Sequence, residues 1–191
     1  MLLGDEDGAP FQLRRKVYPE GPRPASTSSW TIEFDASPWG GGAVLRHGER
    51  CVEYFAQKWH EHSAPHTEAE IGLPKWQTFW EFSTLLLALE VWGSHFTQEE
   101  VAVLGDNTGS LQNAIDLKGR GPLLSIAREL AWRKAKFEWK YSVGHLASEH
   151  NILADALSRM ASPEPSRLPD PVKRAREITA PDLKSLWKLR D

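Results

Sequence analysis

Four acidic residues stand in apolar surroundings where a carboxylate has no evident structural purpose. Asp35 interrupts an apolar strand pattern directly before a turn, and Asp106 ends a short apolar run. Glu81 lies within the stretch WQTFWEFSTLLLAL, and Asp155 lies between two leucines. A carboxylate in such surroundings is costly unless a cation or a hydrogen-bond partner compensates its charge. If these side chains converge, they repel one another unless divalent cations hold them together.

The chemistry that needs several converging carboxylates is phosphodiester hydrolysis with two metal ions. One Mg²⁺ activates the attacking water and the other stabilises the leaving oxygen, at a separation of roughly 4 Å. Oxygen ligands suit Mg²⁺, and the absence of a cysteine cluster argues against structural zinc. Taken alone, Asp106 could also cap a turn or the following helix. Glu90 is expected to face solvent, because it lies about 900° around the helix from Glu81.

Hydrophobic periodicity predicts the elements that would carry these residues. Trp30, Ile32 and Phe34 alternate with polar residues, which indicates a strand. Turn residues at 40–42 and 47–48 lead into two further strands at 43–45 and 51–55. These three strands are expected to form an antiparallel meander.

The second half of the pattern alternates helices and strands. Residues 76–92 carry Phe79, Phe82, Leu86 and Leu89 at helical spacing, and VAVLGDN is typical of a strand buried on both faces. Helices are predicted at 108–117 and 123–136, a fifth strand at 137–143, and a last helix at 148–160 with Ser148 as its N-cap. The order βββαβααβα predicts an α/β fold with a five-stranded mixed sheet flanked by helices.

Proline-rich segments border this pattern on both sides. Residues 1–28 contain four prolines and are interpreted as an N-terminal tail or linker. Residues 162–191 are interpreted as a proline-rich, mixed-charge C-terminal tail with a short helix near 181–189. The predicted domain spans 29–161, and its flanks suggest a segment of a larger polyprotein or a remnant of one.

The composition limits the class of protein. A chain of 191 residues with 40% hydrophobic and 26% charged residues fits one globular domain. The single cysteine, Cys51, excludes an internal disulfide framework and suits a reducing compartment. The sequence has neither a membrane-length apolar run nor a secretory signal, so we expect an intracellular protein, in the cytoplasm or the nucleus. Most of the nine tryptophans fall in apolar periodic stretches, which favours core packing over base stacking.

Basic residues concentrate in one stretch although the net charge is −3. Between positions 118 and 140 there are seven Lys or Arg residues and two Glu residues. The stretch is either a phosphate-binding patch or a solvated helix face. The candidate nucleic-acid-binding residues are Lys118, Arg120, Arg128, Arg133 and Lys134.

Four motifs resemble those of one enzyme family. FDASPWGGGAVL (34–45) resembles the first hairpin of type 1 ribonucleases H, and WEFSTLLLALEVW (80–92) resembles their first helix with its catalytic glutamate. GDNTGSLQNA (105–114) matches the strand-end aspartate of that family. HNILADALSR (150–159) is close to the N-x-x-A-D-x-L-S-R ending of retrotransposon ribonuclease H domains, and it is the most specific of the four. The resemblance covers about residues 30–161.

The resemblance implies a ribonuclease H-like fold and an endonuclease that hydrolyses the RNA strand of RNA–DNA hybrids. The implied catalytic metal ligands are Asp35, Glu81, Asp106 and Asp155, which would hold two Mg²⁺ ions, with Mn²⁺ as an alternative. His145 stands ten residues before Asp155, where the family has a mobile histidine that transfers a proton or aids product release. His150 is the rival position, for which a capping or surface role is expected.

Departures from the family pattern suggest which partners to expect. The first motif reads FDAS where the family more often has T-D-G-S, which keeps the ligand. The short distance from Asp106 to the next long helix leaves no room for the basic protruding helix of many cellular enzymes. Retroviral domains of this family also lack that helix, and their hybrid binding depends on the attached polymerase. The implied partners are therefore an RNA–DNA hybrid and a reverse transcriptase domain, in cis or in trans.

Other interpretations compete with this one. A catalytically silent nucleic-acid-binding or polymerase-tethered module would keep the fold without turnover. A DNA-cutting nuclease or an integrase of the same superfold shares the metal chemistry but does not predict the A-D-x-L-S-R ending. The group His60, His62, His66 and Cys51 has no closed four-ligand spacing and is not expected to bind a metal.

Overall fold

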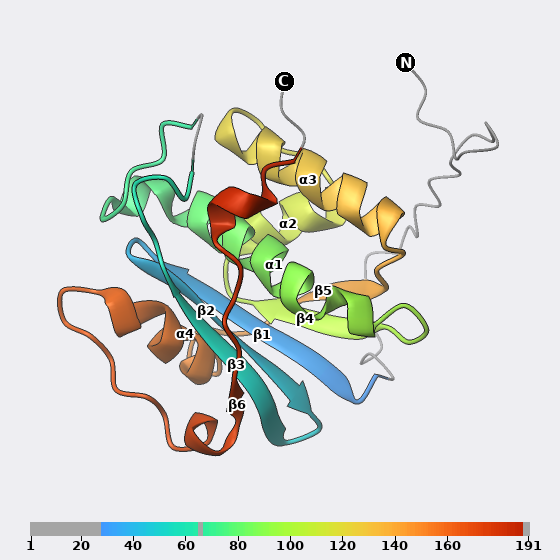
Figure 1. Ribbon diagram of the computed structural model, residues 1–191, viewed down its shortest axis with the longest axis vertical. Coiled ribbons are helices and arrows are strands. Elements are labelled where there is room, and N and C mark those ends of the chain that lie inside the picture. The colour runs from blue at the N-terminus through green and yellow to red at the C-terminus, as the bar shows by residue number, and fades with distance from the viewer. Residues whose placement is uncertain (1–27, 65–66, 189–191) are drawn as a thin grey trace.

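The computed structural model describes residues 28–64 and 67–188, which form a mixed sheet with helices on both faces (Figure 1). The strands lie in the order β5-β4-β1-β2-β3-β6. Their bounds are β1 Trp30–Ser37, β2 Gly40–His47, β3 Arg50–Lys58, β4 Val101–Gly105, β5 Tyr141–His145 and β6 Arg176–Glu177. The predicted α/β class and element order are confirmed. The predicted strand number is one too low, because β6 forms from the segment expected to be a tail.

The β1–β2 hairpin divides its residues between the two faces of the sheet. Ile32 and Phe34 belong to the main core beneath helix α1 (Gln77–Trp92), whereas Asp35 lies on the other face and opposite Gly42 of β2. A Cβ atom on Gly42 would lie 2.4 Å from the Cβ of Leu157 and 2.6 Å from the backbone nitrogen of Ser158. Glycine at position 42 therefore allows helix α4 (Ile152–Ser158) to lie directly on the sheet.

Helix α1 forms the centre of the fold and is buried on nearly all sides. The helices are α1 Gln77–Trp92, α2 Thr108–Asp116, α3 Pro122–Lys136 and α4 Ile152–Ser158, with short 3₁₀ turns η1 Pro74–Trp76 and η2 Gly93–His95. The positions predicted to face the core along α1 are buried, and so are Leu85 and Leu87 between them. The reason is that the sheet covers one side of α1, while α2, α3 and the C-terminal turn η5 (Leu183–Leu186) contact other sides of the helix.

Two elements begin later than predicted. Strand β5 begins at Tyr141 rather than at 137, because the Phe137 amide donates to the Arg133 carbonyl and Glu138 has a φ of 53°. Helix α4 begins at Ile152 rather than at 148, because a turn precedes it in which the His150 amide donates to the Ala147 carbonyl. Ser148 is therefore not the N-cap.

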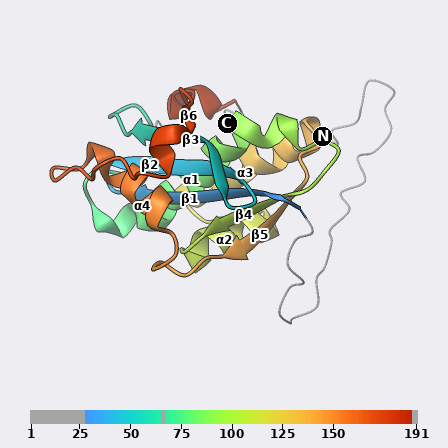
Figure 2. The same cartoon turned by 90° about the horizontal axis from the view of Figure 1, so that it is seen from below.

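The C-terminal segment passes around the β3 edge of the sheet, from the α4 face to the α1 face (Figures 1 and 2). Its elements are η3 Arg159–Ala161, η4 Val172–Arg174, β6 and η5 Leu183–Leu186. Strand β6 pairs in parallel with β3, and Arg176 pairs there with the buried carboxylate of Glu53. Glu53 also accepts a hydrogen bond from Nε1 of Trp92 at 2.8 Å. The segment predicted as a tail thus contributes buried side chains and a strand.

Parts of the sequence interpretation fall outside this description. The N-terminal tail predicted at 1–28 lies, apart from Ser28, outside the described residues, and the domain limits stay a prediction. No helix within the described ranges is long and apolar enough to cross a bilayer. All nine tryptophans lie in the described ranges and are buried or half-buried, which agrees with their predicted role in packing.

Candidate metal centre

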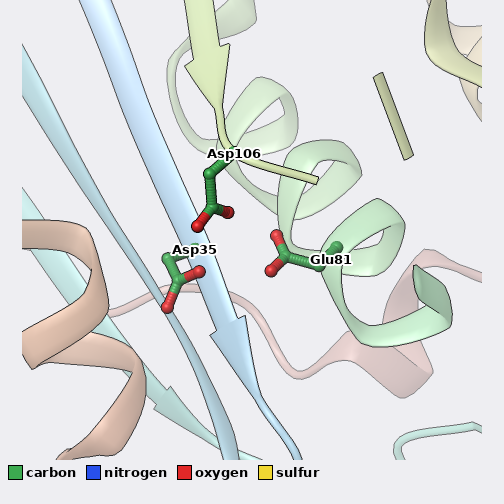
Figure 3. A group of neighbouring side chains, drawn as sticks. All are labelled: Asp35, Glu81 and Asp106. Atoms are coloured by element: carbon green, nitrogen blue, oxygen red, sulfur yellow. The ribbon is translucent and has the colours of Figure 1, made fainter. Parts of the chain in front are cut away.

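Three carboxylates from three different elements converge at the C-terminal ends of the neighbouring strands β1 and β4 (Figure 3). Asp35 comes from the central strand β1, Glu81 from the second turn of α1, and Asp106 from the residue that follows β4. One oxygen atom of each side chain lies within 4.8 Å of the others. Asp35 and Glu81 are buried, with 5% and 2% of their surface exposed, and Asp106 is half-buried. A site of this kind can hold a hard divalent cation.

The two oxygen atoms of Glu81 have different surroundings. One, Oε1, accepts a hydrogen bond from Nε2 of Gln77 at 3.0 Å, and the same nitrogen donates to the Ala36 carbonyl. The other, Oε2, is buried and accepts no hydrogen bond from an N–H or hydroxyl group among the described residues, and the carboxyl groups of Glu81 and Asp35 are close enough to share a proton. A buried acceptor without a partner is costly, and a bound cation would remove that cost.

Burial and mutual repulsion make the carboxyl groups of Asp35 and Glu81 hard to ionise. Desolvation, together with the negative charges of Asp106 and Asp155, raises the pKa of Asp35 to about 6, although a hydrogen bond from Ser158 opposes the rise. The pKa of Glu81 is raised well above its usual value by desolvation and then by the charge of Asp35. Without a cation the pair therefore retains protons in mildly acidic solution.

Asp155, the fourth predicted ligand, lies beside this cluster without belonging to it. The Ser158 hydroxyl lies 2.6 Å from Oδ2 of Asp35 and 2.9 Å from the Asp155 carbonyl, so the two residues are close together. Its carboxylate is 44% exposed and forms an ion pair with Arg159, one helical turn later, at 2.7 Å. Asp155 is placed where it could complete a second cation site, but its present partner is an arginine.

His145 ends strand β5 and pairs in register with Gly105, the residue before Asp106. Its side chain is exposed. The parallel strand β5 therefore brings His145 to the same end of the sheet as the carboxylates. His150 is also exposed and lies in the turn before α4, as expected for a surface role.

The predicted basic residues have different environments. Lys118 and Arg120 are exposed in the loop between α2 and α3, and Arg128 is exposed on α3. Lys134 is half-buried, with its ammonium group 4.2 Å from the centre of the Tyr141 ring.

The prediction that Arg133 binds nucleic acid is wrong, because its side chain is only 2% exposed. Its guanidinium group pairs with Glu90 at 2.5 Å, lies 3.7 Å from Glu129, and donates to the Leu186 carbonyl at 2.8 Å. Glu90, expected to face solvent, is 27% exposed and serves this ion pair.

Several polar residues at or next to the centre were not predicted from the sequence to belong to it. Ser148 donates to Oδ2 of Asp106 at 2.7 Å, and Ser158 donates to Oδ2 of Asp35 at 2.6 Å. Asn151, which is buried, donates to the Phe34 carbonyl at 3.0 Å and thereby ties the start of α4 to β1. Asn151 and Ser158 are the asparagine and serine of the N-x-x-A-D-x-L-S-R ending, so the motif was the signal that could have identified them, whereas Ser148 was expected only as an N-cap.

The loop between β3 and η1 carries His60, His62 and His66, and its described part shows no second group of metal ligands. His60 and His62 are exposed and Cys51 is buried, while His66 lies outside the described residues. Within 28–64 and 67–188, the three carboxylates described above are the one group of at least three His, Cys, Asp or Glu side chains close enough to share an ion.

Comparisons with known proteins give likenesses of structure only. No protein-family model matches the chain, and no curated protein sequence matches it significantly. Among solved structures, LC11-RNase H1, isolated from compost by a metagenomic approach, is similar with 18% identity and a TM-score of 0.52, over 69% of this chain and 92% of its own. RNase H1 from the archaeon Halobacterium salinarum NRC-1 shows 20% identity and a TM-score of 0.49, over 69% of this chain and 96% of its own. With the sheet order and helix arrangement, the likeness to LC11-RNase H1 shows that the chain has a ribonuclease H-like fold.

Proposed function

We propose that the protein is an endonuclease that hydrolyses the RNA strand of RNA–DNA hybrids with the help of two divalent cations. The observation that carries this proposal is the convergence of Asp35, Glu81 and Asp106 within 4.8 Å, on a ribonuclease H-like fold and at the positions of the resembling motifs. Acidic residues gather on many protein surfaces without function. Here, however, two of the three are almost fully buried, and their mutual repulsion needs compensation.

The donor set fits magnesium, with manganese as an alternative. Asp35, Glu81 and Asp106 would hold one ion, and Asp155 would join Asp35 in holding the second after it leaves Arg159. Bound Mg²⁺ would polarise the phosphate and lower the pKa of the attacking water. The buried Oε2 of Glu81, which no N–H or hydroxyl donor reaches among the described residues, fits this best, because a bound cation would compensate it and carboxylates are hard oxygen ligands.

The remaining side chains would handle the proton and the substrate. His145 would transfer a proton or help to release product, since it is exposed at the same end of the sheet and an imidazole titrates near neutrality. Lys118, Arg120, Arg128 and Lys134 are the remaining candidates for contacts with the nucleic-acid backbone. Recognition of RNA would use its 2′-hydroxyl groups across the minor groove, so sequence specificity should be low.

A reverse transcriptase domain, in cis or in trans, is the proposed partner, and a retroelement the proposed origin. Both rest on the motif resemblance. The expectation of a short connection is met: α2 ends at Asp116 and α3 begins at Pro122, so only a short loop stands where a basic protruding helix would be inserted. This observation also favours the second candidate function, a polymerase-tethered or catalytically silent nucleic-acid-binding module.

The proposal is tested by cleavage of a labelled RNA–DNA hybrid in Mg²⁺, beside duplex DNA and single-stranded RNA. We expect cleavage of the hybrid alone, and its loss in EDTA and in the Asp106→Asn variant. Glu61→Gln is the matched control, because Glu61 is an exposed carboxylate that does not belong to the acidic cluster, and this variant should retain full activity. If the folded wild-type protein cuts no substrate but binds the hybrid, the silent-module function replaces the one proposed.

A further inference from the structure

Two buried serines join the strand that carries Asp35 to the helix that carries Asp155. Ser158, at the end of α4, donates from its hydroxyl to Oδ2 of Asp35 at 2.6 Å. In return, Ser37 of β1 donates from its hydroxyl to the Ser158 carbonyl at 2.7 Å. Ser158 is fully buried and Ser37 is 3% exposed. The two contacts are alike in length and burial, but only the first involves a carboxylate of the centre.

The Ser158 hydroxyl has one proton and two acceptors within reach. The second acceptor is the carbonyl of Asp155, three residues earlier on α4, at 2.9 Å. Serines inside helices often donate to such a preceding carbonyl. Hydrogen bonds to a carboxylate are stronger and shorter than those to neutral acceptors, about 2.5–2.7 Å for a hydroxyl donor. The 2.6 Å contact therefore indicates that the Ser158 hydroxyl donates its hydrogen bond to Asp35, and not to the Asp155 carbonyl, when Asp35 is ionised.

This hydrogen bond decides how the Asp35 carboxylate is oriented. The terminal torsion of an aspartate is broad and roughly two-fold, so a free carboxylate samples many orientations. A donor on Oδ2 removes that freedom and leaves Oδ1 available as a ligand. Figure 3 shows the three carboxylates with oxygen atoms turned toward one another, as this arrangement requires.

Ser158 also helps to set the distance between α4 and the sheet. Its backbone nitrogen lies next to Gly42, where a Cβ atom would approach it to 2.6 Å. The hydroxyl of Ser158 and the carboxylate of Asp155 are on the same helix, one turn apart. The contact with Asp35 therefore links the orientation of one predicted ligand to the position of another.

We propose that Ser158 is a positioning residue of the carboxylate centre, which holds Asp35 by one oxygen so that the other faces Glu81 and Asp106. This inference rests on the function proposed above, since it assumes that the centre binds divalent cations. Ser158 would act through Asp35 and would not touch the substrate. Partners that orient metal ligands in this way typically change metal affinity or activity 10- to 100-fold when removed.

The test compares Ser158→Ala with Ser37→Ala in metal binding by the purified, full-length protein. Mn²⁺ affinity is measured without substrate, by electron paramagnetic resonance of the free ion. We expect Ser158→Ala to bind Mn²⁺ at least roughly tenfold more weakly than the wild type. Ser37→Ala loses a similar buried hydrogen bond between the same two elements but keeps the donor to Asp35, so its affinity should remain close to that of the wild type. In hybrid cleavage at fixed Mg²⁺, Ser158→Ala should lower kcat and leave KM unchanged.

The outcomes separate this inference from the proposed function. Equal Mn²⁺ affinities in the two serine variants would overturn the positioning role while leaving the metal centre intact. A wild-type protein that binds no Mn²⁺ would overturn the proposed function and the positioning role with it. If Ser158→Ala does not fold, Ser158→Cys takes its place, since a thiol has similar size but donates weakly. Wild-type affinity in the cysteine variant would also contradict the role.

Discussion

Replacing Arg133 by methionine should destabilise the protein and leave nucleic-acid binding by the folded molecules unchanged. The guanidinium group of Arg133 is buried between Glu129 and Glu90, and the Glu129 side chain is only 1% exposed. Methionine fits the helix and the apolar part of the site but supplies no charge. Glu129 would then lose its contact with Arg133 while remaining buried, and the Leu186 carbonyl would lose a donor.

The size of this effect follows from the burial. Breaking a buried ion pair by removing one partner costs about 3–5 kcal/mol, because the other charge stays buried. For a protein of this size, each kcal/mol lowers Tm by about 2–4 °C, so the midpoint should fall by roughly 10 °C. The Lys188 amide, which donates to Glu129 at 2.6 Å, should also exchange its hydrogen faster, because the C-terminal segment loses an anchor.

The assay is denaturant unfolding followed by circular dichroism, together with hybrid binding per folded molecule. Lys136→Met, an exposed basic residue on the same helix, is the matched control and should change stability little. Removing both fully buried charges in Arg133→Met/Glu129→Leu should recover much of the lost stability, since neither of them then remains in the site. A loss below about 1 kcal/mol in Arg133→Met, or no recovery in the double variant, would refute this reasoning.

Two further predictions concern the centre and the glycine beneath α4. In EDTA, the stability of the wild type relative to Asp35→Asn should fall by on the order of 3 kcal/mol as the pH rises from about 4 to about 6. The reason is that the folded-state pKa of Asp35, raised to about 6, makes the native protein bind more protons than the unfolded chain over this range. Urea unfolding across this range measures the stability, and a constant difference between the two proteins would contradict the prediction. Mg²⁺ at pH 7 should restore the stability of the wild type only. Gly42→Ala should lower the free energy of unfolding by about 1–3 kcal/mol and weaken Mn²⁺ binding, because the added Cβ would collide with the backbone of α4. Thermal unfolding and metal titration check this prediction, and unchanged values in both would disprove the close approach.

Local sequence patterns were sufficient to predict most of the fold. Alternation along β1, helical spacing along α1 and the apolar run of β4 each reflect one environment that a residue and its near neighbours share. The order of elements and the three clustered carboxylates could be predicted for the same reason, because each acidic residue interrupts a strong local pattern. Boundaries were less certain, since the turn before α4 and the left-handed Glu138 depend on contacts outside the local pattern.

The sequence by itself was sufficient to predict the fold class, the element order and the acidic residues that converge, because periodicity and misplaced charge are properties of the chain alone. The same reasoning also predicted Asp155, which forms an ion pair with Arg159 and does not join the cluster. Only the tertiary structure decided that Arg133 is a buried ion-pair partner and that 172–188 packs against the domain. It also decided that Ser158 contacts Asp35 from 123 positions away. The physical reason is that charge burial, edge pairing and long-range hydrogen bonds depend on which segments meet in space, and a basic helix face or a proline-rich segment looks the same in sequence whether it meets solvent or protein.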